Sequence, residues 1–196
     1  MIHDSDLLDA IAKFPQEEFD GSVYRVTGIN ADPTAFSYNG GRWAPPEAHE
    51  GGCSILYTSL AEQGAIAEVA SYLSLLTPVP KKPLKVHTLS VSAKKVLKLG
   101  LGDFRKVGID PERFPERHYV QTQRVGAALN FLGLDGLIAP SARWDCNNLM
   151  IIQPNHALDA KLEIIGTREV SHREWTTLAG NIEKAEKRFL GIGSLR

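Results

Sequence analysis

The spacing of apolar residues changes from strand-like to helix-like within residues 54–76, which predicts a strand followed directly by a helix. Residues 55–58 are an unbroken run of apolar, β-branched and aromatic side chains, which predicts a buried strand. Ser59 and Glu62 then have the S-x-x-E spacing of a capping box, which predicts that a helix begins there. The apolar stripe of that helix recurs every three or four positions and consists of Ile66, Val69, Leu73 and Leu76.

The same periodicities predict the remaining elements. Alternating or continuous apolar runs predict strands at residues 21–27, 84–91, 136–138, 148–152 and 161–170. Helical spacing predicts a short helix that Asp4 or Ser5 caps and that carries Leu7, Leu8, Ile11 and Phe14, a brief helix at 93–99, and a helix at 120–132 that ends at Gly133. A second capping signature, Ser171 with Glu174, opens a final helix through Trp175, Leu178, Ile182, Ala185 and Phe189. No repeat or domain boundary is found, so we expect one domain over residues 1–196.

Two long segments between these elements, residues 28–52 and 100–117, are rich in turn-forming residues. Long irregular loops in compact domains are commonly functional or disordered. Residues 40–43 of the first loop read Gly-Gly-Arg-Trp, so backbone amides can approach a ligand while Arg42 offers a cation beside the stacking surface of Trp43. The alternative is a hairpin turn whose tryptophan fills the core, and the sequence leaves both interpretations open.

Two further charged residues have unusual positions. Arg25 shares one face of its predicted strand with Val23. It is either an edge residue with its guanidinium in water or an anion binder, because its planar fork of donors suits phosphate. Glu68 lies off the apolar stripe of its helix, with the small residues Gly64 and Ala65 one turn away. It is either an ordinary solvated carboxylate or one that a ligand can approach on a rigid helix.

Composition excludes several classes of protein. The 196 residues are 43% hydrophobic and 23% charged, which are ordinary values for a globular chain with its own core. A net charge of −1 and a pI near 6.6 give no electrostatic reason to expect nucleic acid or an anionic membrane. No signal peptide or membrane span is recognised, so we expect a cytoplasmic protein. Cys53, Cys146 and six scattered histidines lack metal-ligand spacing, and no metal is expected.

Four short motifs, taken together and in this order, resemble the RES domain. They are Tyr24-Arg25, then Gly40-Gly41-Arg42-Trp43 with Pro45, then Leu56-Tyr57-Thr58-Ser59 followed by Ala67-Glu68, and last Ala139-Pro140-Ser141-Ala142 ahead of Asn148-Leu149. The resemblance runs from about residue 23 to residue 152. The chain departs from the family pattern at Ala44, where the family often has asparagine, and by extra residues at both ends.

The resemblance implies an α+β fold similar to the ADP-ribosyltransferases, with a split central β-sheet, flanking helices and a cleft that binds NAD as substrate. The strand and helix at residues 161–190 are expected to pack on that core. The arginine, glutamate and serine that name the family match Arg25, Glu68 and Ser141. By this match, the catalytic residues are Glu68, Arg25 and Tyr57, and the NAD-binding residues are Arg25, Arg42, Tyr57, Ser141 and Trp43. For Ser141, a simple role in the turn after Pro140 is the alternative.

RES proteins are toxins paired with Xre-type antitoxins, so the resemblance implies a toxin that depletes NAD by hydrolysis or phosphorolysis and arrests growth. A mono-ADP-ribosyltransferase that modifies a cellular protein would use the same residues, and the sequence does not separate these two. A non-catalytic nucleotide-binding module is a third interpretation, which the complete arginine–tyrosine–glutamate set disfavours. The expected partner is an Xre-type helix-turn-helix antitoxin. Residues 28–52 and 100–117 are expected to face it, or a second copy of the chain in a homodimer.

Overall fold

The computed structural model describes residues 4–189, except for the side chains of residue 181 and residues 183–189. Its strands are β1 (Gln16–Gly28), β2 (Ile55–Ser59), β3 (Leu84–Lys98), β4 (Gly136–Pro140), β5 (Asn147–Ile152) and β6 (Leu162–Val170). Its helices are α1 (Ser5–Ala12), α2 (Glu62–Leu73), α3 (Val120–Phe131) and α4 (His172–Phe189), with 3₁₀ turns η1 (Leu101–Val107) and η2 (Gln153–Asn155). This mixture of a largely antiparallel sheet and flanking helices confirms the expected α+β class.

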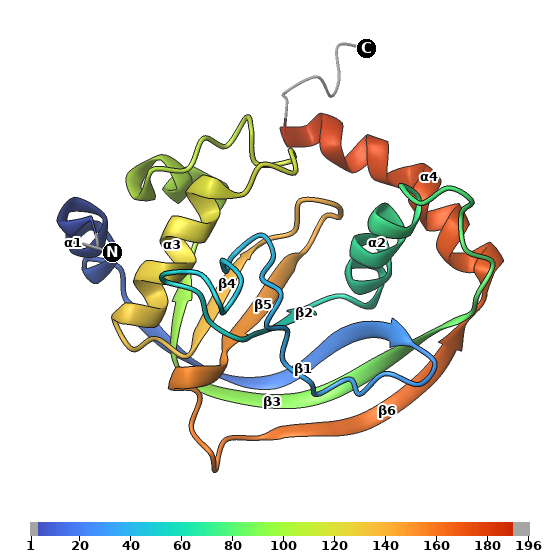
Figure 1. Cartoon of the computed structure of the whole chain (residues 1–196), viewed down its shortest axis with the longest axis horizontal. Coiled ribbons are helices and arrows are strands. Elements are labelled where there is room, and N and C mark those ends of the chain that lie inside the picture. Colours follow the sequence, from blue (N-terminus) through green and yellow to red (C-terminus); the bar gives the residue numbers. More distant parts are fainter. Residues whose placement is uncertain (1–3, 190–196) are drawn as a thin grey trace.

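The central sheet is split into two parts that join at two places (Figure 1). Strands β1, β3 and β6 form one curved antiparallel part, with β3 in the middle. Strands β2, β5 and β4 form the other antiparallel part, with β5 in the middle. The parts join where Tyr24 of β1 pairs with Ser59 of β2, and where residues 96–98 of β3 run parallel to residues 136–138 of β4. The split places the β1–β2 junction beside α2, at the cleft described below.

Two groups of helices flank this sheet (Figure 1). On one side, α3 and η1 bury Leu129 and Phe104 in a cluster that includes Met150 of β5. On the other side, α2 and α4 pack together, and Ile66 of α2 shares a cluster with Trp175 of α4. The rigid part of each wall of the cleft is therefore anchored in its own hydrophobic cluster.

The start of α2 differs from the capping box that the sequence predicted. Ala61 is the N-cap, and no side chain caps the helix. Ser59 instead ends β2 as a buried residue, and its hydroxyl accepts only a long bond, 3.4 Å, from the Ala61 N–H. The Glu62 carboxylate pairs with Arg168 of β6. The capping prediction is wrong because partners distant in the sequence engage both side chains: Cys146 contacts the Ser59 hydroxyl at 3.3 Å, and Arg168 pairs with Glu62.

The buried face of α2 also differs from the predicted stripe. Ile66 is buried, but Leu76 lies beyond the end of the helix and is 38% exposed. The other buried positions are small residues: Gly64, Ala65, Ala67 and Ala70. Small side chains allow α2 to lie close to the sheet and to the loop after β4, which fixes the position of Glu68.

The predicted helix at residues 93–99 is wrong, because β3 continues through these residues to Lys98. The Asp135 carboxylate accepts the backbone N–H groups of Lys94 and Lys95, each at 2.8 Å, and so replaces sheet partners there. A carboxylate 40 residues away gives no local signal of an extended backbone.

Most other predicted elements are confirmed within a few residues. Asp4 caps α1 by accepting the N–H groups of Asp6 and Leu7. Gly133 follows α3 with φ of 73°, the left-handed conformation that suits glycine after a helix. Ser171 accepts the Glu174 N–H at the start of α4, as its capping signature predicts. Ala185 and Phe189 of the predicted helical face lie among the side chains that the structure does not describe.

Candidate active site

A cleft of about 400 Å³ opens where α2, the β1–β2 junction and residues 40–43 meet. This volume lies within the range of small-molecule sites. Among the described residues, Glu68 is the only acidic side chain in its wall. The wall also contains four arginines, Arg25, Arg42, Arg117 and Arg143, and four tyrosines, Tyr24, Tyr57, Tyr72 and Tyr119. Such a lining attracts anions and offers aromatic faces around a single carboxylate.

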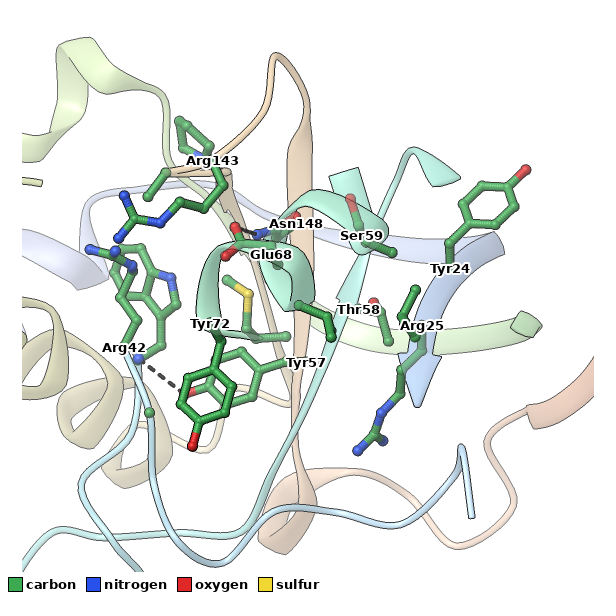
Figure 2. A pocket seen from close by; sticks show the side chains of 18 of the residues that line it. Tyr24, Arg25, Arg42, Tyr57, Thr58, Ser59, Glu68, Tyr72, Arg143 and Asn148 are labelled. Atoms are coloured by element: carbon green, nitrogen blue, oxygen red, sulfur yellow. Dashed lines mark hydrogen bonds between the residues drawn. The ribbon is translucent and has the colours of Figure 1, made fainter. Parts of the chain in front are cut away.

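Glu68 is held in the cleft through one of its two carboxylate oxygens. Its Oε1 accepts a hydrogen bond of 2.6 Å from the Ser141 hydroxyl and one of 3.0 Å from the side-chain amide of Asn148. Figure 2 shows the bond from Asn148 in the middle of the cleft. Among the described residues, no donor reaches Oε2. The carboxylate is therefore fixed on one side and available to a ligand on the other.

Ser141 has no exposed surface and contacts Glu68 from within the protein. Its oxygen accepts the backbone N–H groups of Arg143 and Trp144, at 3.1 and 3.2 Å, so its own proton is directed to Glu68. Ser141 does not line the cleft. Its observed contact is with the carboxylate, and its predicted contact with the ribose or carboxamide of NAD stays a prediction.

A glycine in α2 brings Glu68 to these donors. A Cβ on Gly64 would lie 2.4 Å from the Cys146 sulfur and 2.5 Å from the Ser59 hydroxyl oxygen. Only glycine lets the first turn of α2 approach both β2 and the loop after β4 so closely. Glu68 is one turn later on the same helix. The space that the sequence suggested for a ligand at Gly64 is therefore used by the protein itself.

Arg42 is held rigidly at one end of the cleft. Its guanidinium carbon lies 4.6 Å from the ring centroid of Phe114 and 4.7 Å from that of Tyr119, and its Nη1 donates to the Phe114 carbonyl. Cation–π contacts with two rings fix the plane of the guanidinium. Burial lowers the pKa of Arg42 below its ordinary 12.5, and the nearby Tyr119 and Glu68 oppose this shift. An arginine nonetheless remains charged at neutral pH.

Two more arginines increase the positive charge at this end. Figure 2 shows the Arg143 side chain beside that of Arg42. Arg143 is only 4% exposed, which is rare for arginine. Arg117 bonds the carbonyl and hydroxyl oxygens of Ser71 in α2, at 3.0 and 2.7 Å, and so ties the 100–117 loop to that helix. Repulsion from both of these like charges lowers the pKa of Arg42 further.

Helix α3 holds the loop that carries Arg42. The Thr122 hydroxyl donates to the Arg42 carbonyl at 2.5 Å, and the Gln123 amide donates to the Gly41 carbonyl at 2.9 Å. A Cβ on Gly126 would lie 1.5 Å from the Trp43 carbonyl oxygen, so helix and loop backbones are in direct contact. The loop is therefore part of the rigid scaffold at these residues.

Tyr57 and Trp43 complete the floor of the site. The Tyr57 hydroxyl accepts the Trp43 N–H at 3.1 Å, and burial raises the pKa of Tyr57, so the phenol stays neutral. The Trp43 ring is 3% exposed and packs against Phe104 and Phe114, with centroids 6.3 and 6.0 Å apart. The structure therefore has the core-filling tryptophan that the sequence offered as an alternative, and stacking of NAD on Trp43 stays a prediction. Tyr57 lines the cleft.

Arg25 lies at the other end of the cleft. In Figure 2 its guanidinium points away from Glu68. Its Nη1 donates to the carbonyls of Pro33 and Ala35, at 3.0 and 2.7 Å, so it anchors the 28–52 loop. Burial lowers the pKa of Arg25, and Asp32 opposes this shift. One interpretation of the sequence left this guanidinium in water. The structure shows instead that it bonds two backbone carbonyls.

The structure gathers most of the predicted site residues around one cleft, and it adds others. The cleft contains Arg25, Arg42, Trp43, Tyr57 and Glu68, with Ser141 directly behind Glu68. Sequence reasoning gave no role to Asn148, Arg143, Arg117 or Tyr119. Asn148 is a polar residue directly before four buried apolar residues of one strand, which was a usable signal. No signal in the sequence indicated that Arg117 and Tyr119 would contact the site.

Two other features are absent from the described residues. No group of three or more His, Cys, Asp or Glu side chains there could hold a metal ion. No helix in that part of the chain combines the length and apolar character needed to cross a membrane.

Comparison with known proteins agrees with the fold. The family model of the RES domain matches residues 22–176. Among solved structures, a chain in the crystal structure of the M. tuberculosis MbcT–MbcA toxin–antitoxin complex matches with a TM-score of 0.73 and 20% sequence identity, over 90% of this chain and 98% of that chain. A search of curated proteins found no match. Because the RES family model matches most of the length of the chain, the chain belongs to the RES domain family.

Proposed function

We propose that this chain is a toxin-type enzyme that binds NAD in the cleft and breaks its nicotinamide–ribose bond. One observation carries the proposal: Glu68 is fixed through Oε1 and presents Oε2 to a cleft lined by arginines and tyrosines. The family resemblance, which associates RES proteins with NAD, supports the same substrate. The cleft volume suits binding of a large part of a dinucleotide.

The chemistry requires a fixed negative charge and little else. As the bond between ribose C1 and the nicotinamide nitrogen breaks, its electron pair goes to nitrogen, and nicotinamide leaves as a neutral molecule. Positive charge remains on the ribose, as in the oxocarbenium-like state of glycoside hydrolysis. Glu68 would stabilise that charge, because a preorganised carboxylate acts most strongly where charge develops in the transition state. No general acid is needed for this leaving group.

The arginine cluster is the best candidate site for the pyrophosphate. Arg42 is held between two rings with its charge facing the same cleft as Glu68, and Arg143 and Arg117 add to its field. Bidentate bonds from guanidinium to phosphate combine charge with geometric fit. Tyr57 would then contact the nicotinamide or its ribose from the floor of the cleft.

The test is to incubate purified full-length chain with NAD, with and without inorganic phosphate, and to identify the products. Free nicotinamide with ADP-ribose indicates hydrolysis, in which water supplies the new oxygen at C1. Free nicotinamide with ADP-ribose 1-phosphate indicates phosphorolysis. ADP-ribose attached to added cellular protein would identify the alternative, a mono-ADP-ribosyltransferase. Intact NAD under all conditions would contradict the proposal.

The proposal extends to a protein partner. The MbcT–MbcA structure is a toxin–antitoxin complex, and its fold resemblance to this chain supports an antitoxin here too. The family resemblance makes an Xre-type protein the expected antitoxin. Expression of this chain alone should deplete NAD and stop growth, and co-expression of the cognate antitoxin should restore both. Normal growth and NAD content in a host without any antitoxin would contradict the toxin assignment.

A further inference from the structure

Asn148 is polar, but it lies near the start of a strand that is otherwise built for the core. The four residues that follow it in β5, Leu149 to Ile152, are all buried and apolar. Its side chain instead lines the cleft and donates its amide hydrogen to Glu68 Oε1 at 3.0 Å. Figure 2 shows this amide next to the carboxylate.

The orientation of the Asn148 amide follows from its neighbours. Ser141 already donates to the same carboxylate oxygen, and its own oxygen accepts two backbone N–H groups. If the Asn148 amide were reversed, its oxygen would face a carboxylate, acceptor against acceptor. The amide nitrogen must therefore face Glu68.

This orientation leaves the amide oxygen of Asn148 without a hydrogen-bond partner in the described part of the chain. The Oδ1 atom of Asn148 is buried and has no hydrogen-bond partner among the residues that the structure describes. A buried acceptor without a partner destabilises a fold, and such groups in native proteins call for an explanation. A small apolar residue at this position would avoid the problem. The arrangement therefore favours the carboxylate at the expense of folding stability.

We propose that Asn148 is a positioning residue for the NAD-cleaving reaction: together with Ser141 it binds Oε1 of Glu68 and so directs Oε2 at the developing charge on the ribose. The inference rests on the proposed function for its chemistry. Asn148 acts through Glu68 and needs no contact with NAD. Two donors on one oxygen remove rotation of the carboxylate, and a fixed carboxylate stabilises charge better than a rotating one.

Kinetics of Asn148→Ala separate this role from a purely structural one. We expect kcat to fall on the order of 10-fold, the lower end of the loss seen in metal sites when a residue that only orients a metal ligand is removed. KM should change by less than about 2-fold, because ground-state binding does not use the orientation of Oε2. The midpoint of thermal unfolding should be unchanged or higher, because the unpartnered Oδ1 is removed. A lower midpoint with unchanged kcat would overturn the proposal.

Two matched variants sharpen the result. Asn147→Ala changes the same residue type one position earlier in β5, where the side chain points to the other face of the strand and does not line the cleft. It should leave kcat unchanged. Asn148→Asp keeps the shape but sets a second carboxylate against Glu68, so kcat should be at least as low as in Asn148→Ala. Full activity in the aspartate variant would contradict the proposal.

A double-mutant cycle tests whether Asn148 acts through Glu68. In a Glu68→Gln background, Asn148→Ala should change kcat by less than about 2-fold, because the charge that it orients is gone. An equal loss in both backgrounds would overturn the proposed coupling.

NMR supplies a measurement that does not depend on catalysis. In protein with ¹⁵N-labelled asparagine, the side-chain amide resonance that disappears in Asn148→Asp belongs to Asn148. It should shift in Glu68→Ala, which removes the acceptor, and an unshifted resonance would contradict the contact. If the parent releases no nicotinamide but the resonance shifts, the proposed function fails while the Asn148–Glu68 contact stands. If nicotinamide is released but the resonance does not shift, only the positioning role fails.

Discussion

The two ends of the cleft use arginine in different ways. At one end, Arg25 directs Nη1 to two backbone carbonyls, those of Pro33 and Ala35, and orders the 28–52 loop. At the other end, Arg42 lies between the rings of Phe114 and Tyr119, with Arg143 nearby. Both side chains are partly buried, and burial lowers the pKa of each. The same residue type therefore anchors a loop at one end and concentrates positive charge at the other.

This difference bears on how NAD would bind. Arg25 gives Nη1 to two backbone carbonyls, whereas Arg42 gives Nη1 to one, that of Phe114, and is otherwise held by aromatic faces. More of the donor edge of Arg42 is therefore available to a ligand. We therefore expect the pyrophosphate at the Arg42 end, with Glu68 between the two ends at the ribose. The sequence alone did not distinguish the two arginines.

The largest difference should appear when each arginine is changed to lysine. Arg42→Lys should weaken NAD binding by about 1.5–3 kcal/mol, the usual range for a hydrogen bond to a charged group, because a point charge cannot replace the planar fork. Arg25→Lys should weaken binding less and should lower the midpoint of thermal unfolding, because it loosens the 28–52 loop. Calorimetric titration with NAD and thermal unfolding of both variants provide the two measurements. Equal affinity losses would remove the distinction between the ends, and full affinity in both would remove both arginines from the binding site.

The glycine before Arg42 gives a second test of the rigid end. A Cβ on Gly41 would lie 2.6 Å from the Tyr57 hydroxyl oxygen and 2.9 Å from the adjacent ring carbon. Gly41→Ala should lower the free energy of unfolding by about 1–3 kcal/mol, as overpacking of a close-packed site does. It should also reduce nicotinamide release, because Tyr57 and the Arg42 loop must move apart.

Gly28→Ala is the matched control for this substitution. A Cβ at Gly28, where β1 ends, would have no atom within 4 Å, so stability and activity should stay close to those of the parent. Urea unfolding of both variants provides the comparison. An equally stable Gly41→Ala protein would show that the Arg42 end is not as rigid as described.

A smaller effect is expected at the Arg25 end, as a dependence of stability on pH. His87 of β3 pairs with Arg25 in the sheet, and its ring nitrogens lie 3.0 Å from the Thr27 hydroxyl and 2.9 Å from the Thr167 hydroxyl. Burial lowers the pKa of His87 below its ordinary 6.5, and the positive charges of Lys85 and Arg25 act in the same direction. Because the unfolded chain binds this proton more readily than the folded chain does, stability should decrease as pH falls below about 6.5.

The measurement is the urea midpoint between pH 7.5 and pH 5.5. The parent should lose stability over that range, and His87→Gln, which does not titrate, should lose less. Nicotinamide release at pH 7.5 should differ little between the two proteins, since His87 lies outside the cleft wall. Parallel pH curves for parent and variant would contradict the assignment.

Features determined by local pattern were predictable from the sequence. The continuous apolar runs located β2 and β5, and Gly133 located the end of α3. Interactions between distant residues were not predictable in this way. Glu62 looked like part of a capping box but pairs with Arg168, 106 residues later. Residues 93–99 looked helical because the carboxylate of Asp135 that keeps them extended is far along the chain.

In the candidate site, too, local motifs were predictable from the sequence and contacts between distant residues were not. Motif resemblance selected Glu68, Tyr57 and both arginines, and all four line one cleft, but their roles toward NAD stay predictions. The arrangement around Glu68 depends on α2 meeting the loop after β4, a contact that requires Gly64 and that no pattern within either segment encodes. The partnership of Asn148 with Glu68 was therefore outside the reach of the sequence alone.

The most direct test of the central claim is nicotinamide release from NAD by the parent and by Glu68→Gln, measured in parallel. Glutamine retains an acceptor for Ser141 and Asn148 and has nearly the helix propensity of glutamate, so the free energy of unfolding should change by less than about 0.5 kcal/mol. NAD affinity should change little, because the amide can still bond the ground-state ribose. The rate should fall on the order of 10²–10³-fold, since the lost interaction is with charge that appears only in the transition state. An unchanged rate in a folded Glu68→Gln protein would contradict the account.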